Sequence, residues 1–267
     1  MQKGAETMSN IYCIANQKGG VAKSTSTMNL GAALAVNHNK KVLLIDLDPQ
    51  SNLSEYLKFE PDGKGTLTNL ILEVTSNSVI DSQTVLNTIR YNELNMVYYI
   101  PSDINLANAE SFMQNTLSRE TVLKRILSEE VTSQFDYVFI DCLPSLGILL
   151  INAMTASSKM IIPVQTQKFA MDGLQALNVL HSQIRNTINP ELKIMGMLPT
   201  MVDNTLVSRK VLTTLKETYG ELIFESIISK SIEAAKSTES GRALCLSNCK
   251  VGSKYAFFAE EFLRKQG

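Results

Sequence analysis

The chain has 267 residues, of which 44% are hydrophobic and 19% charged, and its formal net charge is −1. This composition suits one α/β domain with a sizeable core, while no apolar stretch reaches the roughly 20 residues of a membrane span and no signal-peptide core is present. We therefore expect a cytoplasmic protein with a flexible segment at residues 1–9 and one domain at residues 10–267, whose four cysteines form no disulfide framework.

The first predicted strand, residues 11–15, is followed by a glycine-bearing loop and a helix at residues 26–37. The loop reads Lys18-Gly19-Gly20-Val21-Ala22-Lys23-Ser24-Thr25. Backbone amides at a helix N-terminus are unpaired and lie at the positive end of the helix dipole, and glycine lets the chain wrap around an anion. In a P-loop the lysine before Ser or Thr reaches the β- and γ-phosphates, and the hydroxyl ligates Mg²⁺. The segment predicts a phosphate-binding loop in which these residues are Lys23 and Ser24.

The second predicted strand, residues 41–46, is an apolar run that ends at Asp46 and is followed closely by Asp48. Such a run is typical of a buried parallel strand, and open α/β sheets bind ligands at the carboxyl ends of their strands. Phosphoryl transfer needs mainly positioning and charge neutralisation, so one carboxylate near the attacking water is sufficient. The alternative, an Asp pair that caps the next helix, explains one carboxylate but not both.

Residues 62–95 show no clear pattern, and a strand at 96–100 and a helix at 119–130 follow. The next apolar strand, residues 137–141, ends at Asp141. This is the Walker B pattern, in which the aspartate contacts Mg²⁺ through water, because Mg²⁺ keeps part of its hydration.

The C-terminal half predicts strands at 160–164 and 193–198 and helices at 169–187 and 205–218. Alternation of strand and helix with short connections predicts a mostly parallel twisted sheet covered by helices on both faces. The expected fold class is α/β, a single domain of the P-loop NTPase type.

The standard pattern G-x-x-x-x-G-K-[ST] fails at both glycines, which are replaced by Gln17 and Ala22. The loop resembles instead the deviant Walker A box, K-G-G-x-[GA]-K-[ST], of the ParA/MinD superfamily of ATPases. Residues 46–50 are similar to the D-x-D-P-Q segment of that superfamily, and residues 140–147 to its hydrophobic-D-[TC]-P-P-S-L-G segment, with Leu143 in place of the first proline. The resemblance covers nearly the whole chain and is closest to the small, Soj-like ParA partition proteins.

This resemblance implies an ATPase that uses ATP and Mg²⁺ and has weak intrinsic activity. Lys18, the first lysine of the box, would cross a dimer interface to the phosphates of the partner subunit, and Lys23 would neutralise the phosphates of its own subunit. Asp48 would orient or deprotonate the attacking water. The Mg²⁺ shell would include Ser24, Asp46 and Asp141, and the adenine would lie near Thr200 and Met201.

The superfamily divides by what the dimer surface contacts, DNA in partition proteins and the membrane in MinD-like positioning proteins. Residues 205–267 carry ten Lys or Arg and seven Asp or Glu, which permits a local basic face. Phosphate contacts from such a face would give sequence-independent, salt-sensitive DNA binding. The candidate DNA contacts are Arg209, Lys210, Lys216, Lys230, Lys236, Arg242 and Lys254, although most could equally be solvated helix residues.

The C-terminal segment decides between DNA and the membrane. Tyr255, Phe258, Ala259 and Phe262 recur at helical spacing, as a membrane-surface helix would require. Glu260 and Glu261 interrupt the segment and no basic amphipathic extension follows, so we predict core packing and no stable membrane association.

Iron–sulfur binding and tyrosine kinase activity are less favoured. The spacing of Cys245 and Cys249 does not fit the C-x-x-C of iron–sulfur relatives, and a related tyrosine kinase would need a terminal tyrosine cluster where this chain has Tyr255 alone. The loop lies so near the start of the chain that we expect no helix-turn-helix extension. The resemblance implies a nucleoid-associated partition ATPase that forms an ATP-bound homodimer, binds DNA non-specifically and is stimulated by a ParB-like partner.

Overall fold

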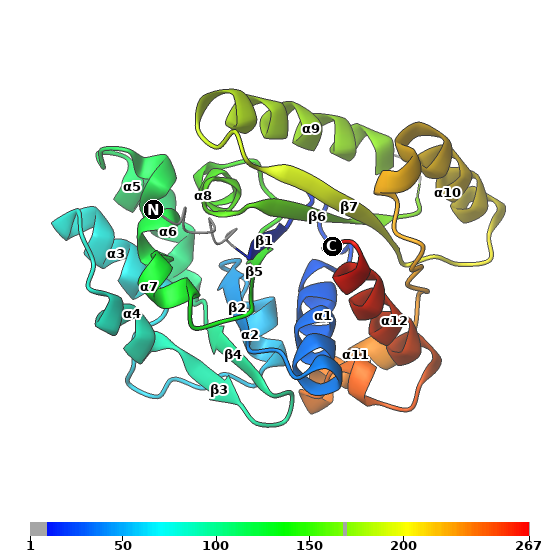
Figure 1. Ribbon diagram of the computed structural model, residues 1–267, viewed down its shortest axis with the longest axis horizontal. Coiled ribbons are helices and arrows are strands. Elements are labelled where there is room, and N and C mark those ends of the chain that lie inside the picture. Colours follow the sequence, from blue (N-terminus) through cyan, green and yellow to red (C-terminus); the bar gives the residue numbers. More distant parts are fainter. Residues whose placement is uncertain (1–9, 168–169, 267) are drawn as a thin grey trace, which may run out of the picture.

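The computed structural model describes residues 10–167 and 170–266, which form one α/β domain around a seven-stranded sheet (Figure 1). The predicted flexible segment at residues 1–9 lies outside these residues. The strands lie in the order β3-β4-β2-β5-β1-β6-β7, and every pairing is parallel except that of β3 with β4. Their bounds are β1 Ile11–Ile14, β2 Val42–Leu47, β3 Arg90–Asn92, β4 Val97–Ile100, β5 Tyr137–Cys142, β6 Lys159–Gln165 and β7 Lys193–Thr200.

The predicted fold class is confirmed, and each predicted strand is found within a residue or two of its expected bounds. The edge strand β3 was not predicted. It is three residues long and lacks an apolar run, so nothing in its own sequence distinguishes it from a loop.

The helices cover both faces of the sheet. The α-helices are α1 Lys23–His38, α2 Asn52–Tyr56, α3 Leu67–Asn77, α4 Ser82–Thr88, α5 Ala109–Met113, α6 Val122–Ile126, α7 Glu129–Thr132, α8 Ile148–Ala156, α9 Ala170–Thr187, α10 Leu206–Tyr219, α11 Glu233–Ser240 and α12 Lys250–Arg264. Four 3₁₀ helices are found among the described residues: η1 Ile104–Asn108, η2 Arg119–Thr121, η3 Gly220–Leu222 and η4 Leu244–Leu246.

The prediction of one helix at residues 119–130 is wrong, because η2, α6 and α7 occupy this stretch as separate short elements. The buried side chain of Asn152 accounts for the break between η2 and α6. Its Oδ1 accepts the amide of Leu123 at 3.0 Å, and its Nδ2 donates to the carbonyl of Arg119 at 2.9 Å. A tertiary contact thus satisfies backbone groups that a continuous helix would pair internally.

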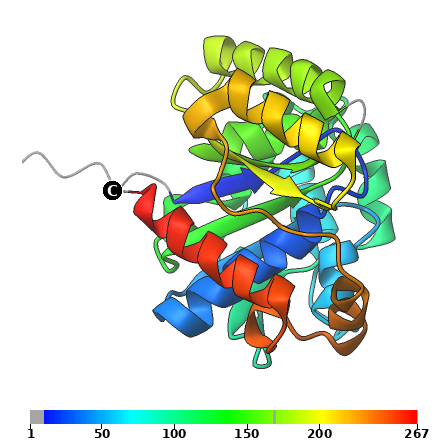
Figure 2. The same ribbon diagram turned by 90° about the vertical axis from the view of Figure 1, so that its right-hand side faces the viewer.

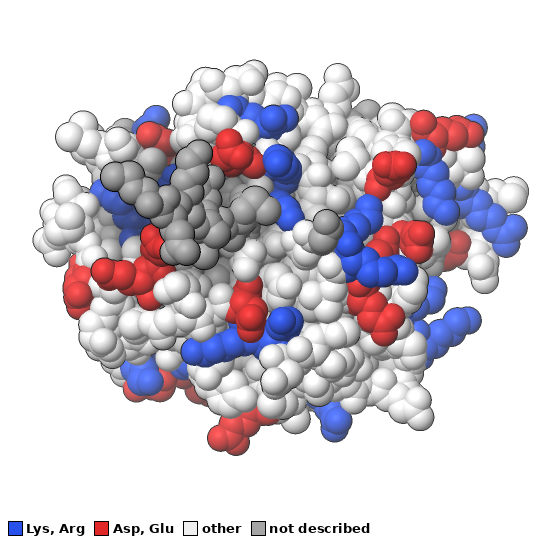
Figure 3. All heavy atoms as spheres, viewed as in Figure 1, with Lys and Arg blue, Asp and Glu red and all other residues white. Residues whose placement is uncertain are grey.

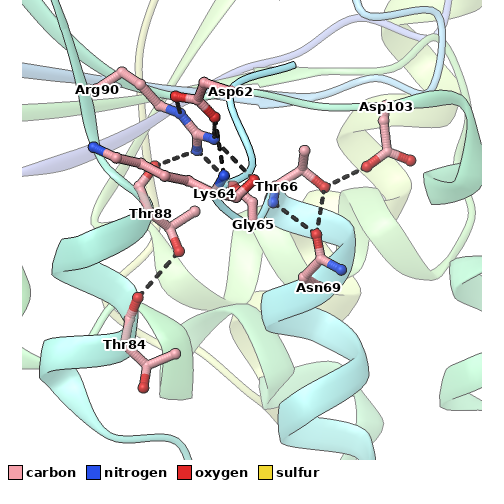
Figure 4. A network of polar contacts seen from close by, with 9 residues as sticks. All are labelled: Asp62, Lys64, Gly65, Thr66, Asn69, Thr84, Thr88, Arg90 and Asp103. Atoms are coloured by element: carbon pink, nitrogen blue, oxygen red, sulfur yellow. Dashed lines mark hydrogen bonds and ion pairs between the residues drawn. The ribbon is translucent and has the colours of Figure 1, made fainter.

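The unclear segment 62–95 contains α3, α4 and β3, and Arg90 holds its loop in place (Figure 4). The guanidinium forms a bidentate pair with Asp62, at 2.6 and 3.1 Å, and also donates to the carbonyls of Lys64, Gly65 and Thr88. This planar, multi-donor geometry is specific to arginine. A side chain of β3 therefore orders the loop that precedes α3.

Alternation along the strands divides the core into two clusters. Ile11 and Cys13 of β1 face the helices α3 to α9, whereas Tyr12 and Ile14 face α1, α2 and α12. In Figure 1 the sheet accordingly separates α1, α11 and α12 from the group α3 to α9. Gly31 lets α1 approach β2 closely, because a Cβ at this position would lie 2.7 Å from a methyl group of Leu44.

The helix α12 packs beside α1, as both views show (Figure 2). Tyr255, Phe258, Ala259 and Phe262 are fully buried, so the predicted core packing of this helix is confirmed. Glu261 is buried as well, which the sequence pattern of an interrupted face did not indicate. Within residues 10–167 and 170–266, no helix has the length and apolar character required to cross a bilayer.

Candidate functional site

The predicted phosphate loop joins β1 to α1, as expected. The helix begins at Lys23, three residues before the predicted start, and its N-cap is Ala22. Ala22 and Gly20 both have positive φ, 64° and 70°. The left-handed region favours glycine, so the alanine holds a conformation that costs about 1–2 kcal/mol for a residue with a Cβ.

A run of free backbone donors lines this loop. Among the described residues, none of the amides from Gly19 to Thr25 donates a hydrogen bond, and the first amide of α1 that does so is that of Ser26, to the carbonyl of Ala22. Consecutive unpaired amides at a helix N-terminus form an anion-binding site. The geometry therefore suits a polyphosphate.

The two lysines of the loop lie in different environments. Lys23 is buried, and its Nζ donates to the carbonyl of Lys18 at 3.3 Å. Burial lowers the pKa of Lys23, and the neighbouring carboxylates of Asp141 and Asp48 oppose that shift. The Nζ of Lys18 is exposed and contacts Oε1 of Gln167 at 3.3 Å.

Asn16 fixes the start of the loop, a role that the sequence analysis missed. Its Oδ1 accepts the amide of Lys18 at 2.9 Å, and its buried Nδ2 donates to the carbonyl of Pro163 in β6 at 2.7 Å. An asparagine directly before the loop is the only sequence signal for this contact.

The two strand-end aspartates meet because β2 and β5 are neighbours in the sheet. Asp46 is the register partner of Asp141, and both are fully buried. Burial raises the pKa of Asp141 to about 8, and the like charge of Asp46 adds to this effect, while Ser24, Lys23 and Thr27 oppose it. Burial likewise raises the pKa of Asp46, to about 6, although hydrogen bonds from Ser54 oppose it.

Asp141 has an unsatisfied oxygen. Its Oδ1 accepts the hydroxyl of Thr27 at 3.2 Å, whereas its buried Oδ2 has no hydrogen-bond partner in the part of the chain that the structure describes. A buried carboxylate oxygen left without a donor is costly unless a ligand binds it. This is the arrangement expected where a cation binds.

The donor set fits Mg²⁺, which prefers oxygen ligands and retains water. The described residues contain no group of three or more His, Cys, Asp or Glu side chains arranged to hold a metal alone. A magnesium ion here would therefore take its remaining ligands from water and from phosphate oxygens. Asp141, Asp46 and the Ser24 hydroxyl at the N-terminus of α1 are the protein groups suited to it.

Asp48 follows β2 by one residue and is 6% exposed. Its Oδ1 accepts the amide of Gln50 at 2.9 Å, and its own amide donates to Oδ1 of Asp46 at 3.1 Å. The side chain is thus fixed at the same edge of the sheet as the phosphate loop. Its Oδ2 has no protein donor among the described residues, so it could accept a hydrogen bond from water.

Thr200 and Met201 lie at the end of β7. The hydroxyl of Thr200 is buried and donates to the carbonyl of Val21 at 3.0 Å, so this side chain supports the phosphate loop. Met201 has a φ of 53° and marks the turn out of the strand. The adenine contact of both residues stays a prediction.

The candidate DNA contacts are spread over α10, α11, α12 and their connections. On the face in Figure 3, Lys and Arg side chains alternate with Asp and Glu. Lys236 forms an ion pair with Glu233 at 3.0 Å, and the partly buried Lys254 donates to the hydroxyl of Ser229. The exposed members are Arg209, Lys210, Lys216, Lys230, Lys236 and Arg242.

Comparison with known proteins identifies the family of the chain. The family model described as AAA domain matches residues 9–194. The chain is 36% identical over 240 residues to the sporulation initiation inhibitor protein Soj of Bacillus subtilis, covering 90% of this chain and 91% of that protein. It is 31% identical over 250 residues to the chromosome partitioning protein ParA of Myxococcus xanthus, covering 93% and 85%.

Solved structures of similar proteins have the same fold as this chain. Cobyrinic acid a,c-diamide synthase from Mycobacterium smegmatis, with bound ATP analog and magnesium, matches with a TM-score of 0.79 and 33% identity over 97% of this chain and 96% of that chain. A putative plasmid partition protein from Borrelia burgdorferi, bound to AMPPNP, matches with a TM-score of 0.76 and 28% identity over 96% and 99%. ATP and Mg²⁺ are the cofactors consistent with these structures and with the loop geometry. The chain belongs to the ParA/MinD-type family of partition ATPases.

Proposed function

We propose that this protein is a small ParA-type partition ATPase of the cytoplasm, associated with the nucleoid, whose ATPase domain spans residues 10–267. ATP with Mg²⁺ builds a sandwich homodimer, the dimer binds DNA without sequence preference, and hydrolysis, stimulated by a ParB-like partner, releases it. The observation that carries the proposal is the different setting of the two loop lysines. Lys23 is buried beside the carboxylates of Asp141 and Asp48, whereas Lys18 is half-buried and its Nζ makes an exposed contact with Gln167.

In the proposed site, Gly19 to Thr25 bind the triphosphate through their free amides, and Lys23 neutralises it from within the subunit. Asp48 orients or deprotonates the water that attacks the γ-phosphate, giving ADP and phosphate. Ser24, Asp46 and Asp141 hold Mg²⁺, which would offset charge on the phosphates. Weak intrinsic activity is expected from the resemblance to the ParA/MinD superfamily.

Lys18 is proposed to act on the nucleotide of the partner subunit. Its exposed ammonium lies against Gln167, a neutral amide, whereas Lys23 already serves the loop from the buried side. A positive charge whose contact is a neutral amide remains available to a second triphosphate. ATP binding and dimerisation would then depend on each other.

For DNA, Arg209 and Lys210 are the strongest candidates, because they are exposed together in the first turns of α10. Lys236 is weaker, since Glu233 already neutralises it, and Lys254 is weaker because it is partly buried and bonded to Ser229. The pair on α10 is therefore the first target for mutation.

DNA co-sedimentation tests the proposal. The protein should be retained on DNA with ATP at low salt, released by ADP, and lost after Lys23→Ala. The variant R209A/K210A should weaken retention and reduce the slope of log affinity against log salt by about one per lost phosphate contact. Lys236→Ala is the matched control, with a smaller expected effect. No retention with ATP in low salt would refute the DNA role.

Light scattering with a non-hydrolysable ATP analogue tests the dimer. Wild type and Asp48→Ala should both form dimers, while Lys18→Ala should stay monomeric although it still binds nucleotide. Asp48→Ala should abolish turnover. A monomeric Asp48→Ala protein with ATP bound would contradict the assignment.

The MinD-like alternative finds little support in α12, because Tyr255, Phe258 and Phe262 lie in the core and Phe257 is its one exposed large hydrophobic side chain among the described residues. ATP-dependent sedimentation with liposomes would nevertheless favour it. Diamide formation on cobyrinic acid, the reaction in the name of one solved relative, would favour a biosynthetic role instead.

A further inference from the structure

Asp46 makes more hydrogen bonds than either other carboxylate of the site. Its Oδ1 accepts the amide of Asp48 at 3.1 Å, and its Oδ2 accepts both the amide and the hydroxyl of Ser54, at 2.8 and 2.7 Å. A carboxylate offers about four acceptor positions. Three are used, and the remaining one is on Oδ1.

The direction of the Ser54 hydroxyl is fixed by a second contact. The amide of Ser102, directly after β4, donates to the Ser54 oxygen at 2.9 Å. Because that oxygen accepts from Ser102, its own proton is free to be donated to Asp46. Ser54 and Ser102 are 2% and 1% exposed, so water cannot replace either bond.

The helix α2, which carries Ser54, is anchored independently. The hydroxyl of Tyr56, on the same short helix, bonds to Ser237 of α11 and lies 3.5 Å from Nδ2 of Asn29 in α1. The short helix is therefore held by Ser54 to the residue pair that follows β4 and by Tyr56 to α11. A side chain fixed in this way can hold the carboxylate in one rotamer.

We propose that Ser54 is the positioning residue of Asp46. By donating two hydrogen bonds to Oδ2 of Asp46, Ser54 would orient the carboxylate so that the one free acceptor position, on Oδ1, faces the hydrated magnesium of the nucleotide. Groups that orient a metal-site carboxylate typically change metal affinity or activity 10- to 100-fold when removed. The inference rests on the proposed role of Asp46 in the magnesium shell.

The test compares Ser54→Ala with Ser54→Thr in the full-length protein. Binding of a fluorescent ATP analogue is titrated with Mg²⁺, and ATP hydrolysis is measured over the same concentrations. Ser54→Ala should raise the Mg²⁺ concentration for half-maximal effect by about 10- to 100-fold. Its affinity for the analogue in EDTA should stay within about twofold of wild type, because the amides of the phosphate loop are untouched.

Ser54→Thr keeps the hydroxyl and should restore the wild-type Mg²⁺ dependence. Ser157→Ala is the matched control, because Ser157 is also 2% exposed and its hydroxyl donates to the carbonyl of Ala153 at 2.7 Å, at the amino-terminal end of β6 and away from the site. It should lower Tm in a similar way without changing the Mg²⁺ dependence. A merely structural role for Ser54 would make the two alanine variants alike.

The inference is overturned if folded Ser54→Ala shows the wild-type Mg²⁺ dependence, or if Ser54→Thr with a wild-type Tm remains as impaired as Ser54→Ala. Failure of the proposed function has a different outcome. In that case wild-type protein itself would show no Mg²⁺ dependence of nucleotide binding or hydrolysis.

Discussion

Two buried carboxylates illustrate the difference between the ligand-binding edge of the sheet and the terminal helix. Asp141 accepts the hydroxyl of Thr27 through Oδ1, and its Oδ2 has no partner among the described residues. Glu261, on α12, accepts the amides of Glu225 and Ser226, at 2.7 and 2.9 Å, and the hydroxyl of Ser226.

The backbone of the two regions also differs. Ala22, Ser51 and Met201 have positive φ near the phosphate loop and the strand ends, whereas no residue other than glycine does so between residues 221 and 266. Positive φ is also found away from the site, at Asn39, Ser78 and Ser118, so the unpaired Oδ2 of Asp141 distinguishes the two regions better than backbone strain does. Both oxygens of Glu261 have protein donors. A buried charge is therefore informative about function only after its hydrogen bonds have been counted.

The largest expected effect separates the two carboxylates by activity. Asp141→Asn removes a charge from the proposed magnesium site and should lower ATP turnover by at least about 100-fold, since a metal contributes several kcal/mol of charge stabilisation. Glu261→Gln should leave turnover within about twofold of wild type. Turnover is measured by phosphate release. If both variants fold and lose ATP turnover equally, the two carboxylates do not differ in function.

For stability we expect the opposite order, with Glu261→Gln having the larger effect. Glu261→Gln places an amide group against donors that need an acceptor and should lower the free energy of unfolding by about 1.5–3 kcal/mol. Asp141→Asn replaces a buried carboxyl whose Oδ2 has no partner among the described residues, and it should leave the nucleotide-free protein unchanged within about 1 kcal/mol, or stabilise it. Urea denaturation without nucleotide measures both. A strongly destabilised Asp141→Asn would mean that this carboxylate is structural.

The pH dependence sharpens the comparison further. The pKa of the Asp141 carboxyl is 3.8 ordinarily and about 8 in the folded protein, so the folded state binds more protons between these values. The free energy of unfolding should therefore fall as the pH rises through this window, by at least about 1 kcal/mol between pH 5 and 8. Asp141→Asn should flatten that part of the profile. If the free energy of unfolding of Asp141→Asn depended on pH as it does in the wild type, the raised pKa of Asp141 would be contradicted.

The smallest effect concerns backbone strain. Ala22→Gly should relieve the left-handed conformation at the N-cap of α1, but the more flexible unfolded chain offsets part of the gain. The net stabilisation should be below about 1 kcal/mol. The same substitution at Ala243, where φ is −59°, should destabilise, and chemical denaturation of both variants compares the two positions.

Much of the site could be predicted because it depends on local sequence. Apolar runs ending in Asp46 and Asp141 predict buried parallel strands whose carboxyl ends share one edge, and the loop from Lys18 to Thr25 precedes a helix. The register of β2 with β5 then brings the two aspartates together. The order of the strands was not predicted, because the α/β class admits several orders.

The contacts that complete the site could not be predicted. Ser54 donates to Asp46 and accepts the amide of Ser102, and Asn16 and Thr200 tie the loop to β6 and β7. The break between η2 and α6 likewise depends on Asn152, and the strand β3 on its pairing with β4. Most of these contacts join segments far apart in the chain, and no periodicity marks any of the pairs.

The amino-acid sequence by itself determined the α/β architecture, the phosphate loop and the identity of the charged groups at the strand ends, because these depend on periodicity and on the chemistry of short segments. Only the tertiary structure decided which buried charges are satisfied, since hydrogen bonding between distant segments depends on how the helices pack on the sheet. Asp141 and Glu261 are both acidic residues in apolar surroundings of the sequence, and only the folded chain shows that one has an oxygen without a described partner and the other does not.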